Sequence, residues 1–296
     1  MTIEKILFPS RFRELSYESL ETLFPLKNAG LKEVLFCHVI SREDVGFVPF
    51  GGYLKEEENK LREEAKIRFA DWQKSLSKRG INSRVTVSVG ETVHEVLKTA
   101  KEEDIDLLII GRKKRVEDTR SFIGSYAHKI ITRCKFPILI SKYMVQFNDQ
   151  DATFTKTNKA PFEMPLFAVD WSERSGRALD LIVSLKGVVR KVFLFFNIDE
   201  KTLGKSSEEE VRTLRGDISK KLQDYCDQLK AAGIEAEPHI GAGGVLDEMI
   251  RISRERKASM IIIGNTSEDR FLSNILDRSL SYQVTKMSEL PTLLVP

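Results

Sequence analysis

A basic loop in the first half of the chain, bounded by glycines, has residue types that suit phosphate binding. Gly111 follows a short apolar segment, and Gly124 and Ser125 precede a segment with helical spacing. Glycines let backbone N–H groups approach a phosphate closely, and a helix N-terminus favours anions. Residues 112–115 are all arginine or lysine. We interpret the loop either as an anion or phosphate pocket or as a charged loop exposed to solvent.

Patterns for other chemistry are weaker. The four histidines are scattered, without cysteine or carboxylate at metal-ligand spacing, so we expect no metal site. The sequence has no Walker loop and no Gly-x-Gly-x-x-Gly motif after a strand. Ser125 has no evident base beside it, so no catalytic residue is predicted. Cys37 and Cys134 lie in apolar segments and are interpreted as packing residues.

Composition narrows the class of protein. The net charge of +3 gives no case for a nucleic-acid partner. No apolar segment approaches the roughly 20 residues of a membrane span, and the N-terminus lacks the apolar core of a signal peptide. The three cysteines lie far apart, which argues against a disulfide framework and fits a reducing compartment. We therefore expect a cytoplasmic protein that binds neither nucleic acid nor membrane.

The segments that must position the loop alternate between short apolar runs and amphipathic stretches. In the first half, the pattern predicts strands at 5–9, 33–40, 82–89, 106–110 and 137–141, and helices at 17–28, 55–79, 92–102 and 125–133. Pro25 should kink or end the first of these helices. The second half predicts strands at 165–169, 191–196, 234–240, 260–263 and 292–295. Its helices are predicted at 172–185, at 206–232 with the capping-box spacing Ser206…Glu209, at 245–256 and after 275. This alternation predicts a mostly parallel sheet covered by helices on both faces.

The two halves repeat one pattern. Residues 106–111 and 259–264 each form a buried strand that ends in glycine, and each is followed by a loop, a helix and a strand led by proline. Leu97 and Gly111 align with Ile250 and Gly264 at one constant offset, which indicates a duplicated domain. We place the first domain at 1–143, a polar linker at 144–163 and the second domain at 164–296.

These motifs resemble the universal stress protein family in its tandem form. The resemblance is carried by the strand ending in Pro9, by His38-Val39-Ile40, by Gly90, and by the segment from Gly111 through Gly124-Ser125 to Phe136-Pro-Ile-Leu-Ile140. It implies an α/β fold with two tandem Rossmann-like domains, each a five-stranded parallel sheet in the order 3-2-1-4-5 with helices on both faces. It also implies that domains pair through their last strands, here 137–141 with 291–295. Many members bind ATP, whereas others have lost the site.

The resemblance assigns candidate ligand-binding residues in the first domain. In ATP-binding members a glycine is followed after two residues by a second glycine and after nine more by Gly-Ser or Gly-Thr. Here Lys114 replaces the second glycine, and Arg11 replaces an Asp that contacts the nucleoside. Val39 matches the position whose backbone holds the base. The candidates are Pro9, Ser10, Arg11, Val39, Gly111, Lys114, Gly124 and Ser125.

The second domain has the opposite pattern. Asp170 is kept, although it could instead serve as the N-cap of the following helix. The phosphate loop is altered, because Ser267 replaces the second glycine and Asp277-Arg278 replaces Gly-Ser. The candidates are Val169, Asp170, Ile198 at the base position, Gly264 and Ser279. We expect this domain to have lost ordinary ATP binding.

Three functions remain open at this point. The first is a non-enzymatic regulatory protein of the stress response whose first domain binds ATP or another phosphate-bearing ligand. The second is a slow ATPase or phosphoryl-transfer enzyme in which Lys114 and Arg115 stabilise phosphate charge. The third is an interaction scaffold without a small ligand. The duplication predicts an intramolecular pseudo-dimer, and two tandem chains are candidates to associate as a homodimer.

Overall fold

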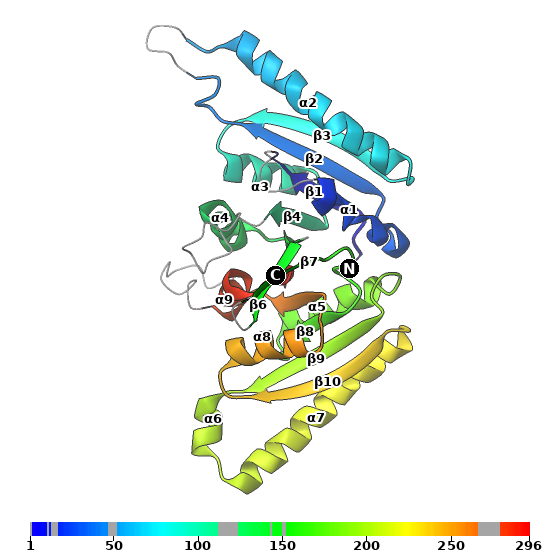
Figure 1. The fold of residues 1–296 in the computed structure, drawn as a ribbon, viewed down its shortest axis with the longest axis vertical. Coiled ribbons are helices and arrows are strands. Elements are labelled where there is room, and N and C mark those ends of the chain that lie inside the picture. Colours follow the sequence, from blue (N-terminus) through cyan, green and yellow to red (C-terminus); the bar gives the residue numbers. More distant parts are fainter. Residues whose placement is uncertain are drawn as a thin grey trace.

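The computed structural model describes residues 2–10, 12, 17–46, 52–111, 124–142, 144–149, 152–265 and 279–296. Strands and helices alternate along both halves of the chain, and the two halves lie end to end (Figure 1).

The first half has the predicted order of elements. Its strands are β1 (Lys5–Pro9), β2 (Glu33–Ile40), β3 (Asn82–Val89), β4 (Leu107–Gly111) and β5 (Ile138–Ser141). Its helices are α1 (Tyr17–Glu21), the 3-10 helix η1 (Phe24–Ala29), α2 (Lys55–Ser77), α3 (Thr92–Glu102) and α4 (Ser125–Arg133). The predicted helix at 17–28 is therefore divided in two. Pro25 lies in the first turn of η1, where its missing N–H leaves no helical hydrogen bond unmade.

The second half repeats this order with one added helix. Its strands are β8 (Pro165–Ala168), β9 (Lys191–Ile198), β10 (Glu235–Ala242), β11 (Met260–Gly264) and β12 (Thr292–Val295). Its helices are α5 (Glu173–Ser184), α6 (Glu200–Lys205), α7 (Glu208–Ala231), α8 (Val245–Glu255) and α9 (Leu280–Met287). The predicted capping box was wrong by one residue, because Ser207 and Glu210 exchange the hydrogen bonds that open α7.

All ten of these strands form one sheet, in the order β10-β9-β8-β11-β12-β5-β4-β1-β2-β3. Within each half the strands are parallel and follow the order 3-2-1-4-5, which confirms the predicted fold. β12 and β5 meet as an antiparallel pair, with Leu293 opposite Leu139. The two halves thus pair through their last strands, as the resemblance implied, and neither apolar strand is left as an open edge.

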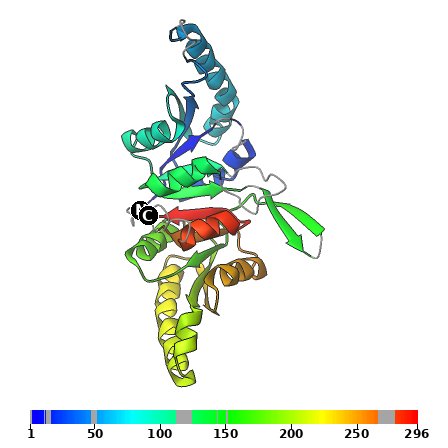
Figure 2. The ribbon, with the colours of Figure 1, turned by 90° about the vertical axis from the view of Figure 1, so that its left-hand side faces the viewer.

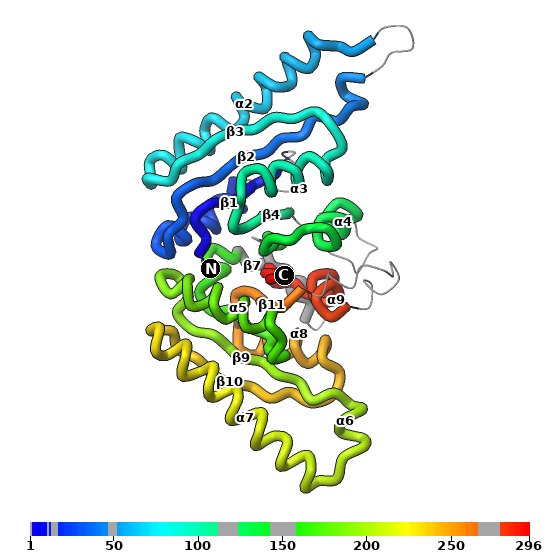
Figure 3. Tube along the Cα trace, turned by 180° about the vertical axis from the view of Figure 1, so that it is seen from behind, coloured from blue at the N-terminus to red at the C-terminus, as the bar shows by residue number. Residues whose placement is uncertain are grey.

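Helices cover both faces of the sheet (Figures 1 and 3). One core contains side chains of η1, α2, α5 and α7 packed on the strands, and the other contains side chains of α3, α4, α8 and α9. The central strands are buried on both sides, which explains why β4 is a continuous apolar run rather than an alternating one. Both cores continue from one half into the other.

Polar contacts reinforce the junction between the halves. The buried Lys142 donates to the carbonyl of Ser288 at 2.6 Å and to that of Thr285 at 3.5 Å, at the end of α9. A cation at a helix C-terminus is favourable because the carbonyl dipoles point toward it. Asn265 Nδ2 donates to the carbonyl of Ile131 in α4 at 3.4 Å.

Gly187 marks a second close approach. It lies in the turn between α5 and β9 and meets the equivalent turn of the first half. A Cβ at this position would lie 2.1 Å from the carbonyl oxygen of Asn28. Only glycine fits there without a shift of the backbone.

The predicted linker contains a hairpin that the sequence analysis did not anticipate. β6 (Met144–Asp149) and β7 (Ala152–Thr157) pair antiparallel, apart from the main sheet (Figure 2). The chain then returns through Asn158, whose Nδ2 donates to the carbonyl of Ser259 at 2.6 Å. The proposed domain limits remain a prediction.

Candidate functional site

The first-domain candidates gather at one edge of the sheet. β1 lies between β2 and β4, and parallel strands present their C-terminal ends at the same edge. Pro9 is opposite Cys37, and the Ser10 N–H donates to the Cys37 carbonyl at 2.9 Å. Val39 is the last residue but one of β2, Gly111 is the last of β4, and both are buried. Ligands of open α/β sheets bind in this position, beyond the C-terminal ends of the strands.

The turn after β1 is held by local hydrogen bonds. Ser10 Oγ accepts from the Phe12 N–H at 2.9 Å, and the Ser10 carbonyl accepts from His38 Nδ1 at 2.8 Å. Because a carbonyl can only accept, the proton of the His38 ring lies on Nδ1. Ser10 is buried, and its N–H, its carbonyl and its hydroxyl are all hydrogen-bonded within the protein.

α4 begins without a side-chain cap. Its N-cap is Gly124, which has no side chain to accept from the first-turn N–H groups, and no acidic residue lies in that turn. Gly124 has φ −93° and ψ 171°, an extended conformation open to any residue, so glycine is not required by backbone strain. Ser125 is exposed. A helix N-terminus without an N-cap side chain, together with the helix dipole, favours an anion.

Two first-domain candidates, Arg11 and Lys114, lie outside the described residues, as do the other cations at 112, 113 and 115. The described part therefore contains Pro9, Ser10, Val39, Gly111, Gly124 and Ser125. The basic contribution to this cleft stays a prediction from the sequence.

In the second domain, the Asp170 carboxylate accepts hydrogen bonds from the turn that contains it. Its Oδ1 accepts from the Ser172 N–H at 2.9 Å and from the Ser172 hydroxyl at 2.6 Å. Ser172 in turn is the N-cap of α5 and accepts from the Ser175 N–H at 3.2 Å. The alternative that Asp170 is the N-cap was wrong. Trp171, with φ 63°, follows Asp170, and the N-cap is Ser172, two residues after Asp170.

The position equivalent to Val39 is Asn197 rather than Ile198. The Gly90 N–H donates to the Ile40 carbonyl, and the Gly243 N–H donates to the Ile198 carbonyl in the same way. Ile198 therefore matches Ile40, and the sequence alignment was off by one residue. Asn197 Nδ2 donates to the Gly243 carbonyl at 2.8 Å, whereas its Oδ1 is buried without a partner among the described residues.

The remaining second-domain candidates also serve the fold. Val169 is buried, and its N–H donates to the Phe195 carbonyl. Ser279 is the N-cap of α9 and its hydroxyl accepts from the Tyr282 N–H at 3.4 Å. At Gly264 a Cβ would lie 3.1 Å from Cβ of Arg174, so the first turn of α5 packs over it. Asp277 and Arg278 lie outside the described residues.

The universal stress protein family model matches residues 2–142 and 165–296. The chain belongs to the universal stress protein family. Because the model matches twice, it is a tandem member. This agrees with the duplicated sheet and with the resemblance drawn from the sequence.

Some relatives match about half of this tandem universal stress protein, and others match almost all of it. Universal stress protein MJ0577 of Methanocaldococcus jannaschii is 27% identical over 153 residues, which are 47% of this chain and 94% of the relative. The structure of a universal stress protein from Archaeoglobus fulgidus matches 99% of this chain and 96% of its own, with 20% identity and a TM-score of 0.70. One from Pseudomonas aeruginosa matches 99% and 93%, with 15% identity and a TM-score of 0.66. The last two support the fold alone.

Both universal stress protein domains place an aromatic residue in left-handed backbone after their first strand. Phe12 has φ 59° and Trp171 has φ 63°. Phe12 lies 5.4 Å from the His38 ring, and Trp171 lies 4.6 Å from the equivalent Phe196. Left-handed backbone costs roughly 1–2 kcal/mol in such residues and persists where packing enforces it. The sequence analysis missed this pair, although the equal positions of the two aromatics were a usable signal.

Cysteine and metal chemistry find little support. Burial raises the pKa of Cys37 to about 12 and that of Cys134 to about 11, so neither thiol is ionised near neutral pH. Among the described residues, no group of His, Cys, Asp and Glu side chains could hold a metal ion. No helix in the described part of the chain is long and apolar enough to cross a membrane.

Proposed function

We propose that this protein is a non-enzymatic regulator of the stress response whose first domain binds a phosphate-bearing ligand, with ATP as the leading candidate. The second domain has lost this capacity and serves as a fixed partner for the first. The family supports a role in stress, since its relatives carry that name. ATP is the ligand that the family resemblance implies.

One contrast carries the proposal. The helix after β4 in the first domain begins at Gly124, an N-cap residue with no side chain to accept from the first-turn N–H groups. The equivalent helix in the second domain begins at Ser279, whose own hydroxyl accepts one of those N–H groups. An anion adds new hydrogen bonds at α4, whereas at α9 it would compete with the cap.

Three buried free thiols also agree with the expected reducing, cytoplasmic location. The surface that paired domains of this family share is already used within the chain by β5 and β12. A homodimer of the tandem chain remains a prediction and would need a different surface.

ATP titration by calorimetry tests the proposal. Gly124→Val should weaken ATP binding at least about tenfold, because the new side chain occupies the approach to the α4 N–H groups. The extended backbone at Gly124 accepts valine, so the fold should survive. The matched control is Ser279→Ala, which should cost about 1 kcal/mol of stability and leave ATP affinity unchanged.

A second substitution tests the sequence alignment. Arg11→Asp restores the nucleoside-contacting carboxylate of ATP-binding members and should raise ATP affinity. An unchanged affinity would show that the cleft is wrongly placed. Absence of binding of ATP by the wild type and by Arg11→Asp would favour an interaction scaffold instead.

A further inference from the structure

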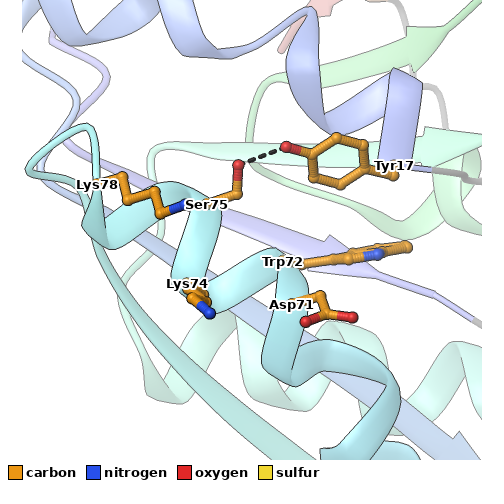
Figure 4. A pocket seen from close by; sticks show the side chains of 6 residues that line it. All are labelled: Tyr17, Asp71, Trp72, Lys74, Ser75 and Lys78. Carbon is orange, nitrogen blue, oxygen red and sulfur yellow. Dashed lines mark hydrogen bonds between the residues drawn. The ribbon is translucent and has the colours of Figure 1, made fainter.

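A groove of about 400 Å³ lies in domain 1, and none of its lining residues is a candidate residue of the nucleotide cleft. It runs between α1 and the C-terminal half of α2 (Figure 4). The lining side chains combine two aromatic rings, a hydroxyl, a carboxylate and two ammonium groups: Tyr17, Asp71, Trp72, Lys74, Ser75 and Lys78. We call this the α2 groove.

The wall of the α2 groove is held in place by hydrogen bonds. The hydroxyls of Tyr17 and Ser75 are hydrogen-bonded and join α1 to α2. Ser75 Oγ also accepts from Arg79 Nη1 at 3.0 Å, and the Arg79 guanidinium lies 4.1 Å from the Phe24 ring centroid. Trp72 packs on the aromatic core, with ring centroids 5.4 Å from Phe69. The aromatic surface of the groove is thus preorganised.

The charged groups of the groove are left unpaired among the described residues. In the N-terminal half of α2, Lys55, Lys60 and Lys66 each pair with a glutamate. No side-chain hydrogen bond or ion pair within the described residues engages Asp71, Lys74 or Lys78. Asp71 and Lys74 are one helical turn apart, yet do not approach to ion-pair distance. Opposite charges are therefore presented side by side next to an aromatic surface.

Domain 2 lacks this combination. At the equivalent positions of α7, Asp224 and Tyr225 correspond to Asp71 and Trp72, but Asp227 and Ala231 stand in place of the two lysines. Gly176 of α5 takes the position of Tyr17. The cationic half and one aromatic wall are present in domain 1 alone.

We propose that the α2 groove binds a small aromatic zwitterion of the amino-acid type. Its ring packs on Trp72 and Tyr17, its carboxylate meets Lys74 and Lys78, and its ammonium meets Asp71. An ammonium near an indole or phenol face gains further from the ring quadrupole. A simple anion would meet Asp71 unfavourably, and a simple cation would meet the lysines, so the zwitterion is the species that satisfies all three charges.

The chain supplies its own reporter, because Trp72 and Trp171 are its two tryptophans. Trp171→Phe leaves Trp72 as the sole indole emitter. We would titrate this full-length variant with L-phenylalanine and follow the emission of Trp72. Three partial probes accompany it: phenethylamine without the carboxylate, 3-phenylpropionate without the ammonium, and alanine without the ring. Phenylalanine should give a saturable change at about tenfold lower concentration than any partial probe.

Charge substitutions in the same background assign the contacts. Lys74→Gln with Lys78→Gln should weaken phenylalanine and 3-phenylpropionate but not phenethylamine. Asp71→Asn should weaken phenylalanine and phenethylamine but not 3-phenylpropionate. The matched control is Lys66→Gln, which removes a lysine of α2 outside the groove and should change nothing. These positions are exposed, so the variants should fold normally.

Equal responses to all ring-bearing probes would mean non-specific stacking and overturn the proposal, as would an unchanged Trp72 emission with phenylalanine. A response that Lys66→Gln removes as effectively as the groove variants would do the same. Gly124→Val should leave the phenylalanine response intact, which separates this site from the nucleotide cleft.

Discussion

The clefts of the two domains have the same framework of strands and helices, but the two domains differ in what the polar groups of the cleft contact. In domain 1 the ends of β1, β2 and β4 meet a helix that begins at an uncapped glycine. In domain 2 the corresponding polar side chains bind the protein itself: Asp170 holds Ser172, and Ser279 caps α9. We propose that domain 1 offers this edge to a ligand, whereas in domain 2 the same edge is part of the packing. A residue type that matches a family motif is thus a poor guide to function until its own hydrogen bonds are known.

The largest expected effect concerns a close contact between the two copies at Gly187. Gly187→Ala sets a Cβ against the Asn28 carbonyl at 2.1 Å, so we expect a loss of about 1–3 kcal/mol in the free energy of unfolding. Urea denaturation measures it. Gly216→Ala, in α7 with nothing within 4 Å of the new Cβ, is the control and should be neutral or stabilising. Equal stability of both variants would show that the turns do not meet as described.

The next prediction exchanges a residue pair between the copies. Val39 lies beside Ser88 in domain 1, and Asn197 lies beside Gly241 in domain 2. A Cβ at Gly241 would lie 2.7 Å from Asn197 Oδ1, so Gly241→Ser alone should destabilise the protein.

Adding Asn197→Val recreates the domain 1 pair and removes the close contact with Asn197 Oδ1, while the contact of the new Cβ with Glu248 Cγ at 2.7 Å stays in both variants. The double variant should therefore be about 1 kcal/mol more stable than the sum of the single effects predicts. A double-mutant cycle by chemical denaturation measures this coupling. Additive effects would contradict the assigned equivalence.

A smaller effect tests whether Asp170 serves structure or ligand. Ser172→Ala removes the N-cap of α5 and should cost about 1 kcal/mol, and Asp170→Ala should cost somewhat less. Thermal unfolding measures both losses. Neither variant should alter ATP affinity. A fall in ATP affinity for Asp170→Ala would indicate that domain 2 binds nucleotide.

The smallest effect concerns the dependence on pH of the stability that Glu58 of α2 contributes. Hydrogen bonds from Lys55, Tyr53 and Arg62 lower the pKa of Glu58 from its ordinary value of 4.5 to about 2. This carboxylate therefore stabilises the fold above pH 4.5, and the contribution disappears as pH falls toward 2.

Glu58→Gln should lower the unfolding midpoint near neutral pH. The difference in midpoint between this variant and the wild type should become smaller in acid. Glu63→Gln, whose ion pair with Lys66 is exposed, is the control and should change little. A difference between wild type and Glu58→Gln that grows in acid would contradict the assigned ion pairs.

The sequence predicted the fold more completely than the site, for physical reasons. Buried apolar strands, amphipathic helices and the constant offset of Leu97 and Ile250 are local signals, and they sufficed for the order of elements. Ile198 was misaligned because β9 is buried on both faces and has no alternation to define its register. The role of Asp170 depended on the left-handed turn at Trp171, and the α2 groove depends on a contact between Tyr17 and Ser75 that is distant in sequence.

The central claim is that domain 1 alone binds nucleotide, and native mass spectrometry with ATP tests it most directly. The account predicts that the wild-type chain carries one ATP equivalent, that Ser279→Ala carries the same, and that Gly124→Val carries none. Retention of the equivalent by Gly124→Val, or a second saturable equivalent lost in Asp170→Ala, would contradict it.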